Sequence, residues 1–388
     1  TNHTKFYFFD DTATTEIYAF PYTTRFRSMR RTLLSFLLAA CSLTSVAHAA
    51  PSAPNYIIED NDFLGPGGSD IQSIIPLLNR PGVSLLGLTV VMGDDWENAE
   101  SAHARRFLEI AHQTQIPVAD GATLPLVNTV AATKLREKQY GTIPWKGAWG
   151  GLGSIDNTPD TQPALGTLPD GAPHLAADAT PAAMFLIREV HAHPHQVTIV
   201  TTGPLTNVAL AIRMDSTFAA TAKQLIFMGG LVDQNMNSVT GNADFASDFN
   251  MITDPEAAHI VLTAPWAAIT CVGNVSNDIM MTHPLMDRIN SRHTPVTEYM
   301  QKFYAPLPMW DELTSAIAVD PSLIRKSVTA YMDFNTAPGM DYGHAHIWPE
   351  STAPKGMNLQ KVKIVTSVDT RSFIEGFVSQ AQNAMGTN

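Results

Sequence analysis

Short apolar runs alternate with segments of helical period along most of the chain. The runs are rich in β-branched residues and nearly continuous, as expected of strands that a sheet buries on both faces. They span residues 56–59, 85–91, 197–201, 224–227 and 268–272. Apolar residues recur at helical spacing in residues 98–112, 182–191, 204–214 and 255–262. This alternation predicts an α/β fold, a single Rossmann-like domain whose mainly parallel central sheet is flanked by helices.

Residues 120–178 interrupt the pattern. This segment is rich in Pro, Gly and Thr, and it contains Trp145 and Trp149. A connection of this length in a compact domain is usually functional or disordered. The two tryptophans favour a lid or a substrate wall, and a packed surface loop is the alternative.

The N-terminal part of the sequence differs from the rest. Residues 1–28 show no helical or strand period and resemble translated adapter sequence, so we expect a non-native leader; a genuine extension is the alternative. Residues 29–49 have the charged start, apolar run and small-residue end of a signal peptide. Cleavage after Ala49 predicts an exported, periplasmic domain of residues 50–388. Lipid attachment at Cys41 would instead predict a membrane-anchored lipoprotein.

Composition and charge exclude several classes of protein. The 388 residues are 45% apolar and 15% charged, which argues against a disordered chain. A net charge of −12 gives no basic excess for binding the phosphate backbone of nucleic acids. Two cysteines cannot form a disulfide framework or a Cys-rich zinc site. No apolar run after Val46 is long enough to suggest a transmembrane segment.

Acidic residues follow the predicted strands. Asp60, Asp62 and Asp70 come after the first run, and Asp94 with Asp95 comes after the second. Ligands of open α/β sheets bind outside the carboxyl ends of the strands. Carboxylates gathered there repel one another unless a cation or a proton neutralises them, and calcium prefers oxygen ligands. The spacing therefore indicates a metal site, although aspartates of this kind also serve as turn and helix-cap residues.

Six motifs in this order resemble the inosine-uridine type nucleoside hydrolases. They are Asp60-x-Asp62 with Asp70, Thr202-Gly-Pro-Leu-Thr-Asn207, Met228-Gly-Gly230, Asp248-Phe-Asn250, Asp254-Pro-Glu-Ala-Ala258 and Trp310-Asp311. The similarity extends from about residue 55 to about residue 384. It implies the nucleoside hydrolase fold, a small nucleoside substrate and hydrolysis of its N-glycosidic bond with Ca²⁺. It also implies self-association as a dimer or tetramer.

The resemblance assigns a metal set. It implies that Asp62, Asp70 and Asp311 bind Ca²⁺ through carboxylates and that the backbone carbonyl of Thr202 is a further ligand. Asp62 would take the proton of the attacking water, and Asp60 would orient the loop.

The resemblance also assigns contacts to the sugar. Asn242, Asp248 and Asn250 would contact ribose hydroxyls, and Met228 would line the sugar pocket. Ser69 stands where the family usually has an aspartate that grips a ribose hydroxyl, so we expect a weaker hydrogen bond from Ser69. A Gly-rich insertion precedes it.

Two residues resemble the purine-preferring branch of the family. Asp94 would protonate the leaving base, and Trp310 would stack on it, since an indole face suits a purine ring. Asp95 is a rival for the role of Asp94, and a core aromatic is the alternative for Trp310. Trp149 or Trp145 would close the other face of the base.

The leading hypothesis is thus a calcium-dependent purine ribonucleoside hydrolase. The alternatives are a pyrimidine or modified-nucleoside hydrolase and a catalytically inactive nucleoside-binding protein. His344 and His346 suggest a metal site only superficially, because no third ligand lies at a diagnostic spacing; we expect a surface turn there.

Overall fold

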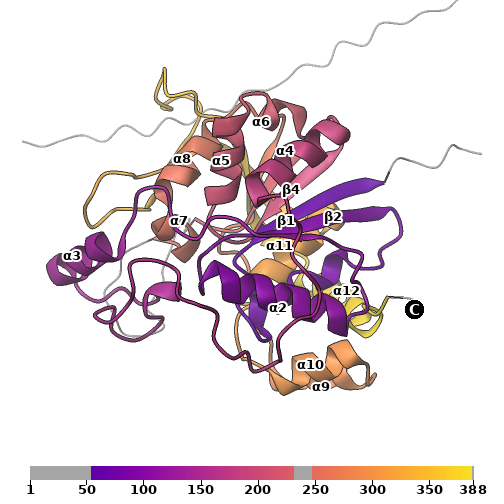
Figure 1. Cartoon of the computed structure of the whole chain (residues 1–388). Helices are drawn as coiled ribbons and strands as arrows, with labels where there is room; N and C mark the ends of the chain where they lie inside the picture. Colours follow the sequence, from indigo (N-terminus) through magenta and orange to yellow (C-terminus); the bar gives the residue numbers. More distant parts are fainter. Residues whose placement is uncertain (1–53, 231–246, 387–388) are drawn as a thin grey trace, which may run out of the picture. The chain divides into compact units, whose positions relative to one another are not determined.

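The computed structural model describes residues 54–230 and 247–386, all within one compact unit, Pro51–Asn388. Its centre is a nine-stranded sheet with the order β3-β2-β1-β4-β5-β6-β9-β7-β8 (Figure 1). The strands are β1 Asn55–Asn61, β2 Val83–Val90, β3 Val118–Ala119, β4 Val197–Thr201, β5 Gln224–Phe227, β6 Ile269–Cys271, β7 Ile324–Phe334, β8 Ala345–Trp348 and β9 Lys361–Val368. The predicted mainly parallel sheet with flanking helices is confirmed.

Helices cover both faces of the sheet (Figure 1). One face carries α4 Ala182–Ala192, α5 Thr206–Met214, α6 Phe218–Thr221 and α8 Pro255–Leu262. The other carries α1 Gly68–Gln72, α2 Glu97–Ile110, α9 His283–Asn290, α10 Pro295–Lys302, α11 Trp310–Val319 and α12 Thr370–Gln382. Two further helices, α3 Val130–Tyr140 and α7 Phe249–Thr253, lie in connections near the carboxyl ends of the strands.

The five predicted strands are all present, and each pairs in parallel with its neighbours in the sheet. Every residue of β4 is buried, which agrees with a sequence made only of Val, Ile and Thr. The antiparallel pairs β9–β7 and β7–β8 were not predicted. The sequence gives no sign of β7 because five consecutive exposed residues follow its first residue, so buried and exposed positions do not alternate there.

The starts of α8 and α4 show how single residues determine where a helix begins. Asp254 caps α8 because its carboxylate accepts the amide hydrogen of Ala257 at 3.0 Å, and Pro255 occupies the first helical position. The motif Thr180-Pro181 looks similar, but α4 begins after it. Pro181 itself is the N-cap of α4, and the Thr180 amide donates to the Asp178 carboxylate at 2.7 Å.

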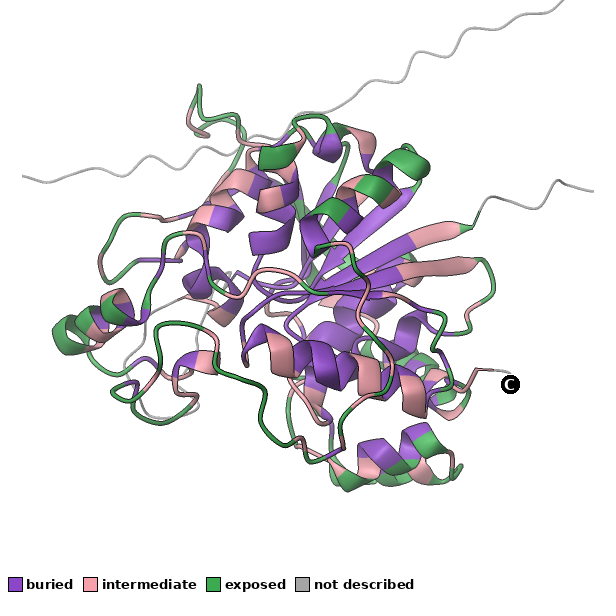
Figure 2. Cartoon of the chain, in the orientation of Figure 1, coloured by how far each residue is buried: buried purple, intermediate pink, exposed green. Residues whose placement is uncertain are grey.

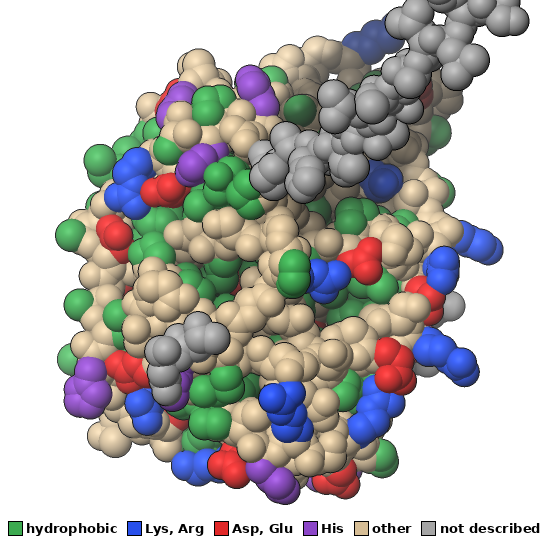
Figure 3. Space-filling view, turned by 90° about the vertical axis from the view of Figure 1, so that its right-hand side faces the viewer, with side chains coloured by type: hydrophobic (Ala, Val, Ile, Leu, Met, Phe, Trp, Pro, Cys, Tyr) green, Lys and Arg blue, Asp and Glu red, His purple; other side chains and the backbone are tan. Residues whose placement is uncertain are grey.

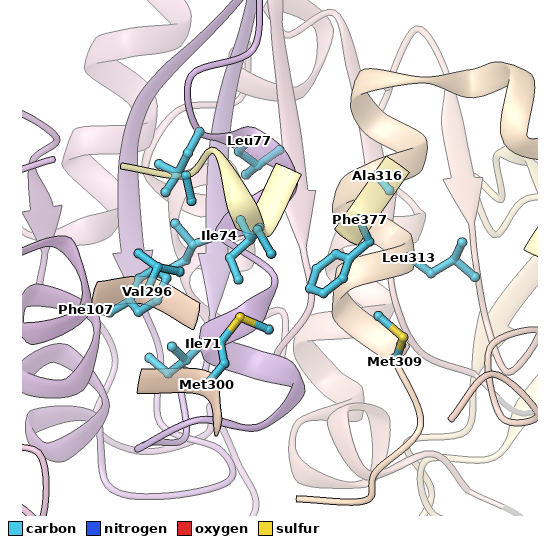
Figure 4. Packing of buried hydrophobic residues seen from close by; sticks show 14 of the residues in the cluster. Ile71, Ile74, Leu77, Phe107, Val296, Met300, Met309, Leu313, Ala316 and Phe377 are labelled. Atoms are coloured by element: carbon cyan, nitrogen blue, oxygen red, sulfur yellow. The ribbon is translucent and has the colours of Figure 1, made fainter. Parts of the chain in front are cut away.

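The core consists of two large apolar clusters, one on each side of the sheet. Figure 2 shows buried residues concentrated in the strands and on the inward faces of the helices. On the α11 side, Ile71 and Ile74 pack in one cluster with Met309 and Leu313 of the α11 region and with Phe377 of α12 (Figure 4). This packing fixes α11 beside α1, and both helices supply residues to the site described below.

Surface charge is mixed on the face shown in Figure 3, where Lys and Arg side chains lie among Asp and Glu. Within the two described ranges, no helix has the length and apolar character needed to cross a membrane. The predicted leader, the predicted signal peptide with Cys41, and Asn242 lie outside the described residues.

Candidate active site

The predicted site lies at the carboxyl edge of the sheet. Asp62 directly follows β1, and Thr202 directly follows the adjacent parallel strand β4. Asp94 follows the end of β2 at Val90. Neighbouring parallel strands end at the same edge, and the structure therefore brings these three residues together.

Two helices on one face of the sheet add further carboxylates. Asp70 lies in α1, which the Gly-rich turn places after β1, and Asp311 lies in the first turn of α11. Both side chains are buried. The two carboxyl groups face each other closely enough to share a side-chain hydrogen bond.

Asp62, Asp70 and Asp94 form the carboxylate group of the site. One oxygen of each lies within 4.8 Å of the others. Asp62 is held firmly: its Oδ2 accepts the Asp94 amide hydrogen at 2.9 Å. Two glycine backbones flank the same carboxylate, because a Cβ on Gly93 would lie 2.0 Å from Oδ2 and one on Gly203 would lie 2.5 Å from Oδ1. The second carboxylate oxygen, Oδ1, is buried without a hydrogen-bond partner.

Burial and mutual repulsion make these groups hard to ionise. Burial is the main cause that raises the pKa of Asp62 well above its usual value, and the charges of Asp94 and Asp70 add to the effect. Burial also raises the pKa of Asp70 and of Asp311, and each has further carboxylates nearby. The pKa of Asp94 rises to about 7, again chiefly through burial. In the described ranges, none of the ion pairs supplies a Lys, Arg or His to these four residues.

These residues fit a hard divalent cation. The donors are carboxylate and carbonyl oxygens only, which are the ligands that calcium and magnesium prefer. An unpartnered buried oxygen on Asp62 is available for a metal bond. A cation there would remove the repulsion that raises the pKa values of the group.

Asp60 stands behind the carboxylate group. Its Oδ1 accepts hydrogen bonds from the Thr89 hydroxyl at 2.6 Å and from the Asn207 amide at 2.8 Å. Asn207 also donates to the Val90 carbonyl at 2.7 Å. These bonds tie β1, β2 and α5 together directly below the site, as expected of a residue that orients the loop.

A polar wall from β5 and α7 faces Thr202. Asn250 donates from Nδ2 to the Thr202 carbonyl at 2.6 Å, and Nδ2 also lies 3.4 Å from the Met228 sulfur. Asp248 caps α7 by accepting the Asn250 amide hydrogen at 3.0 Å. Its charge is also one of the causes that raise the pKa of Asp94, after burial. The structure thus groups three of the predicted sugar contacts, Met228, Asp248 and Asn250, beside the carboxylates.

The two tryptophans of the 120–178 segment have different positions. The Trp145 indole N–H donates to the Asp94 carboxylate, and its ring packs edge-on against Phe249 with 6.4 Å between the ring centroids. Trp149 is buried in a small apolar cluster with Met92, Trp96, Val130 and Ile155. Trp145 therefore faces the site, and Trp149 supports the segment from within. A segment without a period gives no basis for ranking the two from sequence.

Position also distinguishes Asp94 from Asp95 and locates Trp310. Asp94 belongs to the carboxylate group, whereas Asp95 turns back to accept the Trp96 amide hydrogen at 2.7 Å. Trp310 is the first residue of α11, is half-buried, and donates from Nε1 to the Asn277 side chain at 2.7 Å. Trp310 directly precedes Asp311 in the first turn of α11.

Ser69 makes two hydrogen bonds to α11. Its hydroxyl accepts the Asp311 amide hydrogen at 3.0 Å and donates to the Glu312 carboxylate at 2.7 Å. Both partners belong to α11, so the hydroxyl is bound to that helix. The predicted hydrogen bond from Ser69 to a ribose hydroxyl stays a prediction.

Sequence reasoning missed two buried glutamates near the site. Glu312 is 1% exposed, and burial raises its pKa to about 8. Glu100 of α2 accepts the Asp95 amide hydrogen at 2.6 Å and is fully buried. Charged residues on helices usually face solvent, so no signal separated these two from surface residues. His344 and His346 contact each other at 5.4 Å between ring centroids, but among the described residues only the carboxylate group brings three potential metal ligands together.

Comparisons with known proteins identify similar sequences and a similar fold. A family model described as inosine-uridine preferring nucleoside hydrolase matches residues 57–375. The chain is 30% identical over 347 residues to the uncharacterized protein C800.11 of Schizosaccharomyces pombe, covering 84% of this chain and 85% of that protein. It is 34% identical over 247 residues to the probable uridine nucleosidase 2 of Arabidopsis thaliana, covering 63% of this chain and 67% of that protein.

A solved structure shares the fold. The inosine-guanosine nucleoside hydrolase (IG-NH) superposes with a TM-score of 0.65 and 22% identity, covering 84% of this chain and 98% of that chain. The similar proteins thus carry names of both purine and uridine specificity.

Proposed function

Because this chain belongs to the inosine-uridine preferring nucleoside hydrolase family and is therefore a nucleoside hydrolase, we propose that it cleaves purine ribonucleosides to free base and ribose with calcium. One observation carries the choice of base: a half-buried carboxyl group, Asp94, lies in the carboxylate group and receives the Trp145 indole N–H. A second tryptophan, Trp310, directly precedes Asp311 in α11.

Calcium would be held by the carboxylates of Asp62, Asp70 and Asp311 and by the Thr202 carbonyl. When bound, it would supply positive charge that lowers the pKa of a coordinated water and fixes the ribose diol. The unpartnered Asp62 oxygen and the raised pKa values of the group support this assignment.

Asp62 is the proposed general base. Its carboxylate is clamped between two glycine backbones, so it has little freedom to turn away from a bound water. In the proposed reaction, the water oxygen bonds to the anomeric carbon, Asp62 takes the water proton, and the bond from carbon to the base nitrogen breaks. Asn250 and Asp248 hold the ribose hydroxyls, and Met228 lines the sugar pocket.

Asp94 is the proposed general acid. Burial raises the pKa of Asp94 to about 7, and Asp94 would give a proton to the leaving purine. Trp310 stacks on the base, because an indole face attracts the positive charge that a purine gains on protonation. Trp145 holds the acid in place and closes the site opposite Trp310.

A nucleoside panel tests the proposal. Purified protein of residues 50–388 should release reducing sugar from inosine, adenosine or guanosine with calcium present, and a chelator should abolish the release. Absence of any release from these nucleosides with calcium added would refute the proposal.

A pyrimidine or modified-nucleoside hydrolase is the second candidate. The uridine nucleosidase name of one relative and the missing carboxylate at Ser69 favour it. Comparing kcat/KM for uridine and inosine decides between the two, since a strong uridine preference would remove the roles of Asp94 and Trp310 toward the base.

An inactive nucleoside-binding protein is the third candidate, motivated by the altered loop before Asp70. Calorimetry beside the reducing-sugar assay distinguishes it: tight inosine binding without turnover would support it.

The proposal also covers the localisation and the oligomeric state of the protein. Export with cleavage after Ala49 makes it periplasmic, and lipid attachment at Cys41 is the alternative. Mass spectrometry of the mature N-terminus separates the two and also reports on residues 1–28. Light scattering tests the proposed dimer or tetramer.

A further inference from the structure

The Ser69 hydroxyl connects α1 to the start of α11. Helix α11 has no side-chain cap of its own, because its N-cap residue is Met309. The Asp311 amide hydrogen belongs to the first turn, where helices leave amide hydrogens unsatisfied. Ser69 accepts that hydrogen at 3.0 Å and thereby caps α11 from another helix.

Glu312 determines which way this hydroxyl points. A serine hydroxyl has one hydrogen to donate, and here the Glu312 Oε2 atom accepts it at 2.7 Å. With the hydrogen committed to Glu312, a lone pair of the same oxygen is left for Asp311. Ser69, Glu312 and Asp311 are all buried, so water does not replace a lost partner without cost.

The chain neighbours of this pair are the proposed metal ligands. Ser69 directly precedes Asp70, and Glu312 directly follows Asp311. The hydrogen bond between Ser69 and Glu312 therefore joins α1 to α11 one residue away from the facing carboxyl groups of Asp70 and Asp311.

Resting on the proposed calcium-dependent function, we propose that Glu312 is a positioning residue. It holds the Ser69 hydroxyl, and through it the Asp311 amide, so that the carboxylates of Asp70 and Asp311 keep the separation that a shared cation requires. The role needs a hydrogen-bond acceptor at position 312. Neither Ser69 nor Glu312 has to touch the reacting atoms.

The fold does not depend on this hydrogen bond. Behind it, Ile71 of α1 and Met309 and Leu313 of the α11 region pack into one apolar cluster (Figure 4). Loss of the Ser69 hydroxyl leaves this packing in place, so the variants are expected to fold and to differ in the site.

The test compares calcium affinity by calorimetry with kcat for inosine at saturating calcium. Ser69→Ala and Glu312→Leu should each weaken calcium binding about tenfold, which corresponds to about 1.4 kcal/mol. The double variant should lose no more than either single variant, because both remove the same connection. Glu312→Gln keeps an acceptor oxygen and should stay within about threefold of the wild type. In Glu312→Leu and Glu312→Gln, kcat at saturating calcium should stay within about threefold.

Ser315→Ala is the matched control. Ser315 lies one turn further along α11, and its buried hydroxyl also donates to a buried glutamate, Glu59, at 3.0 Å. This hydrogen bond does not involve an amide of the first turn of α11. Removing the Ser315 hydroxyl should therefore leave calcium affinity unchanged.

The outcomes separate failure of the positioning role from failure of the proposed function. A wild-type protein that binds no calcium overturns the proposed function. Calcium binding by the wild type with unchanged affinity in Ser69→Ala overturns the positioning role. Equal losses in Glu312→Gln and Glu312→Leu, additive losses in the double variant, or an equal loss in Ser315→Ala overturn it as well.

Discussion

The clamp around Asp62 makes a sharp prediction for Gly93→Ala. The added Cβ would lie 2.0 Å from Asp62 Oδ2, whereas Cβ contacts begin at about 3.0 Å, so the oxygen must move by about 1 Å. It cannot retreat freely, because Gly203 lies close to the other oxygen: a Cβ on Gly203 would be 2.5 Å from Oδ1. A misplacement of about 1 Å in a reacting group costs roughly a hundredfold in rate. We therefore expect kcat for inosine to fall about a hundredfold, or about 2.7 kcal/mol in the barrier.

The assay measures kcat at saturating calcium and nucleoside, together with unfolding in urea. Gly93→Ala should also lower the free energy of unfolding by about 1–3 kcal/mol, the usual cost of overpacking. Gly376→Ala is the matched control: Gly376 is exposed in α12, and a Cβ added there would have nothing within 4 Å. It should leave kcat unchanged and raise the free energy of unfolding by up to about 1 kcal/mol. If Gly93→Ala kept kcat within about threefold of the wild type, the rigid placement of Asp62 would be refuted.

Three further predictions concern Asp94, Trp145 and His259. Asp94→Asn should lower kcat for inosine by about 10²- to 10⁴-fold and keep calcium affinity within about threefold; a large loss of calcium affinity in calorimetry would make Asp94 a ligand. Trp145→Phe removes the hydrogen bond to Asp94 but keeps a ring against Phe249, and kcat/KM should fall about 2- to 10-fold, since a hydrogen bond to an uncharged group contributes about 0.5–1.5 kcal/mol. An unchanged kcat/KM would show that Asp94 needs no such support. The hydrogen bond to Asp333 raises the pKa of His259, so its stabilisation is present in acid and fades as pH rises through the folded pKa. His259→Gln should therefore destabilise more at pH 5.5 than at pH 8.5 in urea unfolding, and the reverse order would contradict this sign.

The parallel part of the fold was predictable because burial on both faces leaves a plain mark in the sequence. β4 consists only of the β-branched residues Val, Ile and Thr and is buried throughout, so its pattern and its environment agree. The antiparallel part carries a weaker mark. β7 begins with a long exposed stretch, and β3 has only two residues, so neither offers a period that sequence reasoning can detect.

The residues of the site likewise divide into those that the sequence predicts and those that it does not. Asp62 and Asp94 follow strands, and the rule that ligands bind at strand ends brings them together from sequence alone. Asp311 lies far away in the chain, and only the family resemblance pointed to it. The positions of Trp145 and Glu312 could not be predicted, because each is defined by a contact with a residue distant in the sequence. Trp145 donates to Asp94, and Glu312 accepts from Ser69.

The carboxylates that would hold calcium are distributed over most of the folded chain, from Asp62 after the first strand to Asp311 in the penultimate helix. Such a site exists only after distant segments have met, so a partly folded chain has no high-affinity form of it. Calcium would then bind the native state alone and stabilise it as a whole, by about 2.7 kcal/mol at a free concentration one hundred times Kd. Metal supply would therefore set the lifetime of the folded protein as well as its activity, and depletion would expose the entire domain to proteolysis.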